Sequence, residues 1–134
     1  MTSAIIGRRN ITFGWTWMFL GILVAAGMGL YAFTPDWLGG YASLQRRFLR
    51  LGHISFIALP LINIIYGLLI DTAQLSDRQK KAGSSLMIIA AIFMPLINFL
   101  CIVNGFFQNF FFIPTLSFAG AVIIMTMGQV KRPL

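Results

Sequence analysis

Residues 51–70 read LGHISFIALPLINIIYGLLI, an apolar run that holds the only histidine of the chain, His53. A helix that crosses a membrane needs about 20 mostly apolar residues, and this run has that length. Lipid offers no partner to an unsatisfied backbone group, so a run of this kind is predicted to be helical.

Three further runs have the same character, at residues 11–33, 85–103 and 110–127. Of the 134 residues, 58% are hydrophobic and 10% are charged, whereas about a quarter of the residues of a soluble domain are charged. We therefore predict an all-α integral membrane protein, a four-transmembrane-helix bundle that forms one domain over residues 1–134 and has no soluble domain. The first run exceeds the apolar core of a signal peptide, about 7–15 residues, so it is predicted to be a retained span.

The positive charges predict the orientation. Seven Lys and Arg residues fall on one side of such a bundle and three on the other. Because positive loops stay in the cytoplasm, both termini are predicted to be cytoplasmic, in what we expect to be a bacterial inner membrane. The larger set comprises Arg8, Arg9, Arg78, Lys80, Lys81, Lys131 and Arg132, and the smaller set comprises Arg46, Arg47 and Arg50. The net charge of +7 is attributed to topology and to anionic lipids, and no nucleic-acid partner is expected.

The loops carry local signals. Thr34 followed by Pro35 is typical of a helix start, which predicts a short interfacial helix before the second span. Ser76 and Gln79 match a capping box, so the third helix is predicted to begin ahead of its apolar run. The short segment 104–109 predicts a tight hairpin between the last two spans.

A stripe of polar residues runs along the second span. Arg46, Arg50 and His53 share one helix face, and the same face continues to Asn63. Histidine is a common axial ligand of haem iron, and arginines farther out would pair with the haem propionates. One interpretation is therefore a b-type haem, or another cofactor such as a quinone, held by these three residues. With one histidine, a second axial ligand must come from a methionine, a second copy or another subunit.

The other interpretation of this stripe is structural. His53 lies about one turn inside the predicted interface, where its ring is hydrated or bonds to a headgroup. The arginines then extend to lipid phosphates, or to an acidic surface of a partner protein.

The sequence Pro-Leu-Ile-Asn occurs twice, ending at Asn63 and at Asn98. Each proline frees the carbonyl four residues earlier, that of Phe56 or Ala91. An asparagine of a neighbouring helix is expected to donate to such a carbonyl, which would make these residues helix-packing groups. The alternative is a polar pocket between the second and third spans, with Tyr66 nearby.

Small residues follow each other at a spacing of four in the first span, at Gly21, Ala25 and Gly29. This spacing allows helices to approach closely, so it predicts a surface that packs either against another helix of this chain or against a partner.

The spans contain no Asp or Glu, and proton-driven transporters generally need a buried carboxylate. Neither a cluster of metal ligands nor a nucleophile with a base partner is evident, so we expect no catalytic residues, no metal site and at most a non-catalytic subunit of an enzyme. The expected function is an accessory or anchoring subunit of a larger, energy-transducing electron-transfer complex, with other membrane subunits as partners. The alternatives are a b-type haem or quinone-site subunit that uses His53, a small homo-oligomeric channel or carrier, and a membrane assembly factor.

Overall fold

The computed structural model describes residues 5–31 and 34–130. Four long helices account for most of them: α1 (Gly7–Gly29), α2 (Leu44–Ile70), α3 (Asp77–Val103) and α4 (Phe112–Val130). Two short 3₁₀ helices, η1 (Trp37–Gly39) and η2 (Gly105–Phe110), lie in the first and third connections. Within the described ranges the chain has no strand.

All four predicted spans fall on helices that are long and apolar enough to cross a membrane. The predicted all-α, four-span fold is therefore confirmed at the level of its helices. α1 begins and ends earlier than the predicted run at 11–33, and residue 33 lies outside the described residues, as do Lys131 and Arg132. α4 runs to Val130, three residues beyond its predicted end at 127.

Capping residues explain why α2 and α3 start before their apolar runs. The Ser43 side chain accepts a hydrogen bond from the Arg46 backbone N–H, which starts α2 at Leu44, seven residues before the run at 51–70. Ser76 and Gln79 form the predicted capping box, so α3 starts at Asp77. Each cap satisfies backbone donors that the first helical turn leaves free.

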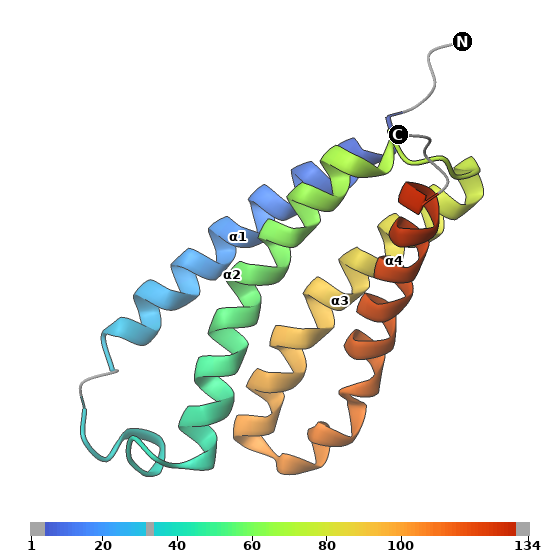
Figure 1. Cartoon of the computed structure of the whole chain (residues 1–134). Coiled ribbons are helices and arrows are strands. Elements are labelled where there is room, and N and C mark those ends of the chain that lie inside the picture. The colour runs from blue at the N-terminus through green and yellow to red at the C-terminus, as the bar shows by residue number, and fades with distance from the viewer. Residues whose placement is uncertain (1–4, 32–33, 131–134) are drawn as a thin grey trace.

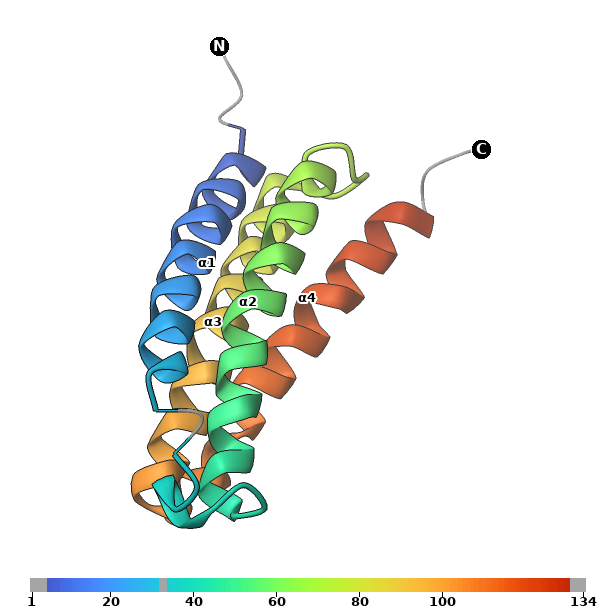
Figure 2. The ribbon, with the colours of Figure 1, turned by 90° about the vertical axis from the view of Figure 1, so that its left-hand side faces the viewer.

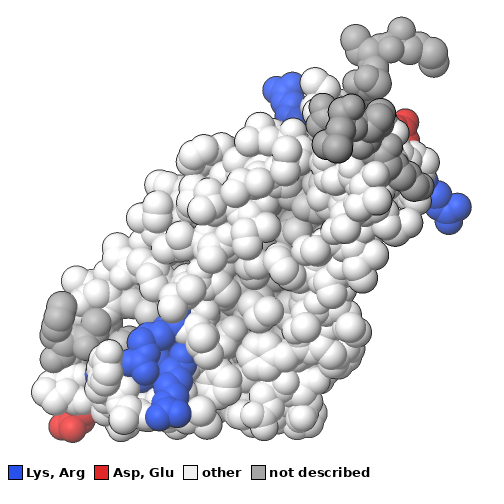
Figure 3. All heavy atoms as spheres, viewed as in Figure 1, with Lys and Arg blue, Asp and Glu red and all other residues white. Residues whose placement is uncertain are grey.

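The helices pack in chain order, α1 against α2, α2 against α3, and α3 against α4 (Figure 1). α4 packs chiefly along α3 and leans away from α1 and α2 (Figure 2). The start of α1, the connection 71–76 and the end of α4 lie at one end of the bundle, and η1 and η2 lie at the other (Figure 1). Charged side chains visible in Figure 3 gather at these two ends, and the middle of the face shown is uncharged.

The first connection contains one 3₁₀ turn at the place of the predicted short helix. The turn is preceded by Asp36, rather than by the predicted Thr34, and Asp36 makes no side-chain cap. Leu38, Gly39 and Gly40 all have positive φ, at 53°, 76° and 88°. Two glycines tolerate this left-handed backbone, which ends the turn and separates it from α2.

Glycines set the distance between α1 and α2. Gly7, Gly14 and Gly21 are spaced by seven residues and are buried. A Cβ added at Gly14 would lie 2.7 Å from the Pro60 carbonyl oxygen, and one at Gly21 would lie 2.6 Å from that of Phe56. The lack of a side chain therefore lets the two backbones touch.

Gly21, one residue of the predicted packing surface of α1, thus packs against α2. Gly29 is exposed, and an added Cβ there would meet nothing within 4 Å. The spacing of seven, rather than four, follows the face of α1 that contacts α2.

Candidate functional site

A buried hydrogen-bond network joins the first three helices. Asn10 of α1, Asn63 of α2 and Ser84 of α3 are each 0% exposed. The Asn10 amide N–H₂ donates to Asn63 Oδ1 at 2.8 Å and to the Ser84 carbonyl at 3.2 Å. The Ser84 hydroxyl donates to Asn10 Oδ1. The Asn63 amide N–H₂ donates to the Met87 carbonyl of α3 at 3.1 Å and to its own helix at the Leu59 carbonyl, 3.3 Å.

Every polar atom of the two amide groups in this network has a hydrogen-bond partner. Each amide nitrogen uses two donor hydrogens and each amide oxygen accepts one bond. A fully bonded polar cluster rigidifies a core, whereas a partly bonded one is costly. The network therefore locks α1, α2 and α3 into one unit.

The two prolines free carbonyls that face α1. The Ala91 carbonyl, released by Pro95, accepts a hydrogen bond from the Trp17 indole N–H at 3.0 Å. The Phe56 carbonyl, released by Pro60, lies against Gly21. The donor to Ala91 is thus an indole rather than the expected asparagine, because both asparagine amides donate to carbonyls elsewhere.

The asparagine of the second Pro-Leu-Ile-Asn sequence, Asn98, has a side-chain oxygen without a hydrogen-bond donor among the described residues. Asn98 donates to the carbonyl four residues earlier, Met94, at 2.8 Å, as Asn63 does to Leu59. Its side chain is only 3% exposed, and no described residue donates to its Oδ1. Asn63 and Asn98 do not contact each other through hydrogen bonds in the described structure, and the partner that Asn63 finds in Asn10 has no counterpart at Asn98.

Tyr66 connects α2 with α4. Its hydroxyl donates to the Ala121 carbonyl at 3.1 Å, passing directly over Gly83 of α3. Tyr66 also packs with Ile70, Met87 and Ala121 in the hydrophobic core cluster. It therefore lies away from Asn98, on the opposite half of the bundle from η2.

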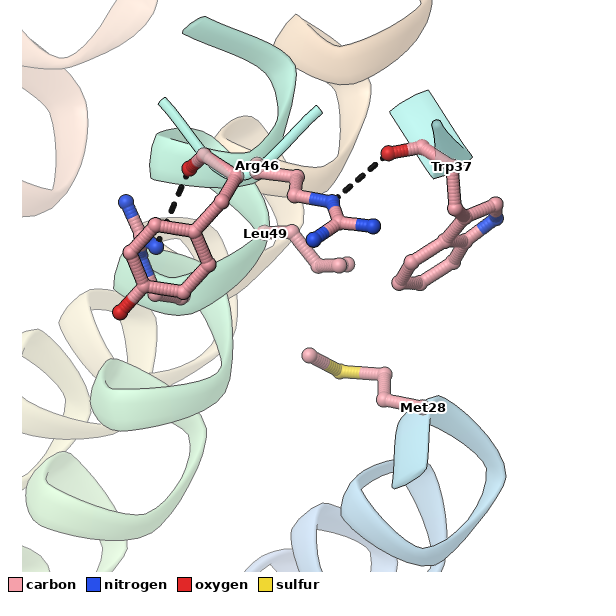
Figure 4. A pocket seen from close by; sticks show the side chains of 6 residues that line it. Met28, Trp37, Arg46 and Leu49 are labelled. Atoms are coloured by element: carbon pink, nitrogen blue, oxygen red, sulfur yellow. Dashed lines mark hydrogen bonds between the residues drawn. The ribbon is translucent and has the colours of Figure 1, made fainter. Parts of the chain in front are cut away.

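Arg46 is used by the first connection. The side chain is 6% exposed. Its Nε donates to the Trp37 carbonyl at 2.7 Å (Figure 4). One of its Nη groups donates to the Thr34 carbonyl, and the guanidinium lies 5.6 Å from the Trp37 ring. Arg46 thus donates hydrogen bonds to two backbone carbonyls of the first connection.

Arg50 is held in a similar way. It donates to the Tyr41 carbonyl at 3.3 Å and stacks over the Tyr41 ring at 4.5 Å. Together with Trp37 and Arg46, these residues line a cavity of about 100 Å³, which Met28 of α1 and Leu49 of α2 close from the side (Figure 4). Ligand pockets usually have about 300–1,000 Å³, so this cavity is small for a macrocycle.

His53 is half-buried on α2, about one turn beyond Arg50 and two turns beyond Arg46. Its Nδ1 is buried and finds no hydrogen-bond partner among residues 5–31 and 34–130. His53 does not line the cavity beside Arg46 and Arg50. The structure thus keeps the three predicted residues along one helix, but it does not bring them together around one site.

Four contributors to the polar contacts were not expected from the sequence: Asn10, Trp17, Asp71 and Ser84. Both Asp71 carboxylate oxygens accept backbone N–H groups at the start of α1, from Ile6 and Gly7, each at 3.1 Å. The available signal was the glycine spacing of seven in α1, because Asn10 and Trp17 each follow a buried glycine by three residues. In the described parts of the chain, no group of three His, Cys, Asp or Glu side chains is placed to hold a metal ion.

The fold defines a class, that of all-helical proteins with four helices able to span a membrane. Comparison with protein families, with curated proteins and with solved structures finds no match to this chain.

Proposed function

We propose that the protein is an accessory or anchoring subunit of a larger membrane complex. The observation that carries this proposal is the hydrogen-bond network of Asn10, Asn63 and Ser84, in which every amide nitrogen and oxygen has a partner. Polar groups at membrane depth are expensive and are often functional. Here these groups bond to one another and to backbone carbonyls and thereby join α1, α2 and α3, which supports the role of a rigid scaffold.

A channel or carrier is supported less well. Such a protein needs polar groups that face a path across the membrane. The buried amides instead bond to each other and to backbone carbonyls, and the grooves between the helices are lined almost wholly by apolar side chains. An assembly factor would use the same scaffold, and it would differ from an accessory subunit only in the partners that it binds.

A haem at His53 is also supported less well. Arg46 has two of its guanidinium groups on the Trp37 and Thr34 carbonyls, so it is not free to pair with a propionate. We propose that the complex is energy-transducing and transfers electrons, and that its partner subunits carry this activity. Anionic lipids are the proposed contacts of the exposed Arg47.

We propose the same orientation as the charges predict, in a bacterial inner membrane. The end of the bundle with Arg8, Arg9 and the connection 71–76 would face the cytoplasm, and η1 would lie at the opposite interface. Cysteines introduced at exposed Asp36 and Gln74 test this. A membrane-impermeant thiol reagent should label only Asp36→Cys from outside intact cells, and labelling of Gln74→Cys alone would reverse the orientation.

Native mass measurement tests the function. A tagged chain is extracted with a mild detergent from its own membrane and weighed as an intact assembly. A subunit predicts other chains in a fixed ratio to this one. Masses that are only multiples of 14.9 kDa would contradict the proposal and favour the homo-oligomeric channel or carrier.

A further inference from the structure

A groove runs between α2 and Phe111, the residue between η2 and α4, and its floor is formed by α3 near the end of the bundle that carries η2. Its volume is about 430 Å³, which falls in the range of small-molecule sites. The walls are apolar apart from Ser55 and Asn98, and are formed by Phe48, Leu51, Ile54, Ala58, Leu59, Met94 and Phe111. Asn98 lies five residues before the end of α3, which is about 7.5 Å along the helix axis and thus within one leaflet of a membrane.

Asn98 gives this groove its chemistry. Its amide nitrogen donates to the Met94 carbonyl at 2.8 Å, which fixes the orientation of the amide, because a reversed amide would place two oxygens face to face. The remaining group is Oδ1, a buried acceptor without a donor among the described residues. An unpaired buried polar group destabilises the protein, so a donor arriving in the groove would recover part of this free energy.

The first Pro-Leu-Ile-Asn sequence shows how such a site is completed. Asn63 makes the same bond to the carbonyl four residues earlier, and its Oδ1 then accepts an N–H from Asn10 at 2.8 Å. At Asn98 no helix supplies the equivalent donor, and the residue lines the groove instead. The missing component is therefore a hydrogen-bond donor on an otherwise apolar body.

We propose that this groove binds a lipid-soluble small molecule that carries a hydroxyl group, and that the hydroxyl donates to Asn98 Oδ1. The ring of a phenol is favoured, because Phe48 and Phe111 stack at 6.4 Å at one wall and Met94 lies at another. Aromatic rings pack well against both kinds of side chain. This site is separate from His53 and does not depend on the proposed scaffold function.

Matched probes test the hydroxyl. The full chain in detergent micelles is titrated with radiolabelled para-dodecylphenol and with para-dodecylanisole, its methyl ether, which cannot donate. The phenol should bind about two- to tenfold more tightly, as expected for one hydrogen bond. Equal binding of the two probes would overturn the proposal. Dodecanol and its methyl ether form a second pair, and a larger preference in that pair would identify an aliphatic alcohol as the ligand class.

Matched variants test the location. Asn98→Leu should abolish the preference for the phenol over the ether, and a preference that persists would overturn the proposal. Ala58→Leu fills the groove without changing Asn98, and it should weaken the binding of both probes. Ala119→Leu makes the same change at an exposed position of α4 outside the groove, and it should alter neither. If Ala58→Leu and Ala119→Leu behave alike, the probes bind elsewhere.

A spectroscopic readout covers the case in which Asn98→Leu fails to fold. With carbon-13 in the side-chain carbonyls of asparagine, the Asn98 signal should shift on addition of the phenol and stay in place with the ether. The Asn63 signal should not move, since its oxygen is already bonded to Asn10. A shift caused equally by both probes would contradict a hydrogen bond.

Discussion

At the scale of single residues, Trp17 shows how a helix defect is repaired. Pro95 cannot donate to the Ala91 carbonyl and so leaves it unpaired within α3. The Trp17 indole crosses from α1 and donates to this oxygen at 3.0 Å, while its ring stacks at 5.5 Å on Phe13 and lies 4.9 Å from Phe56. The proline and the tryptophan therefore depend on each other.

This dependence predicts a non-additive pair of substitutions. Trp17→Phe keeps an aromatic ring but removes the N–H, and we expect a loss of about 1–2 kcal/mol in the free energy of unfolding. In a Pro95→Ala background the Ala91 carbonyl can bond within its own helix, so the same change should cost clearly less. Unfolding by sodium dodecyl sulfate in mixed micelles, followed by circular dichroism, measures both. Equal losses in the two backgrounds would mean that the indole does not act through Ala91.

At the scale of the elements, α1 is attached to α2 by close backbone contact. Gly7 and Gly67 face each other, and an added Cβ at Gly67 would lie 2.5 Å from the Gly7 carbonyl oxygen. Farther along α1, Gly27 and Gly29 have open space around them. The same helix thus contains glycines that are required and glycines that are not.

Alanine substitutions should separate these two kinds of glycine. Gly14→Ala forces apart α1 and the Pro60 carbonyl, and should destabilise the protein by about 1–3 kcal/mol. Gly27→Ala meets no neighbour and should stabilise it by about 0.5–1 kcal/mol, because alanine restricts the unfolded chain. The same micellar unfolding experiment compares them. A similar response at both positions would contradict the close packing of α1 on α2.

The start of α1 is capped from another helix. Ile6 precedes α1 and offers no side-chain cap, and the Asp71 carboxylate at the end of α2 takes this role. A negative charge at a helix N-terminus also interacts favourably with the helix dipole.

Replacing this cap should loosen one end of the molecule. Asp71→Ala removes both acceptors, and we expect a cost of about 0.5–2 kcal/mol. The backbone amides of Ile6 and Gly7 should exchange with deuterium faster, while those at the centre of α2 and α3 should keep their rates. Asp36→Ala, at an exposed residue without a side-chain cap, is the control. Unchanged exchange at Gly7 would exclude the capping role of Asp71.

At the scale of the whole molecule, local patterns in the sequence were sufficient to predict the four long helices. The four apolar runs predicted the helices, and Ser76 with Gln79 predicted the start of α3, because both signals act over a few residues. The partners of Asn63 could not be predicted in this way. Asn10 lies 53 residues away in the chain and Trp17 lies 74 residues from Ala91, so their roles depend on which helix faces meet.

The predicted stripe of Arg46, Arg50 and His53 illustrates the same limit. Helical spacing correctly placed the three residues along α2, but the spacing carries no information about the first connection. That connection folds back and takes the guanidinium groups of both arginines for the carbonyls of Thr34, Trp37 and Tyr41. A sequence rich in cations near a histidine therefore does not distinguish a cofactor site from the anchoring of a loop.

The central claim is that Asn10 and Asn63 hold three helices together, and a double-mutant cycle tests it most directly. Each single change, Asn10→Leu or Asn63→Leu, leaves polar groups unpaired and should lower the free energy of unfolding by about 1–3 kcal/mol. Because the two amides bond to each other, the double variant should lose clearly less than the sum, with a coupling of about 1 kcal/mol. Thr126→Val, whose hydroxyl bonds only within α4, serves as the control and should be close to neutral. Additive losses at Asn10 and Asn63 would contradict the account.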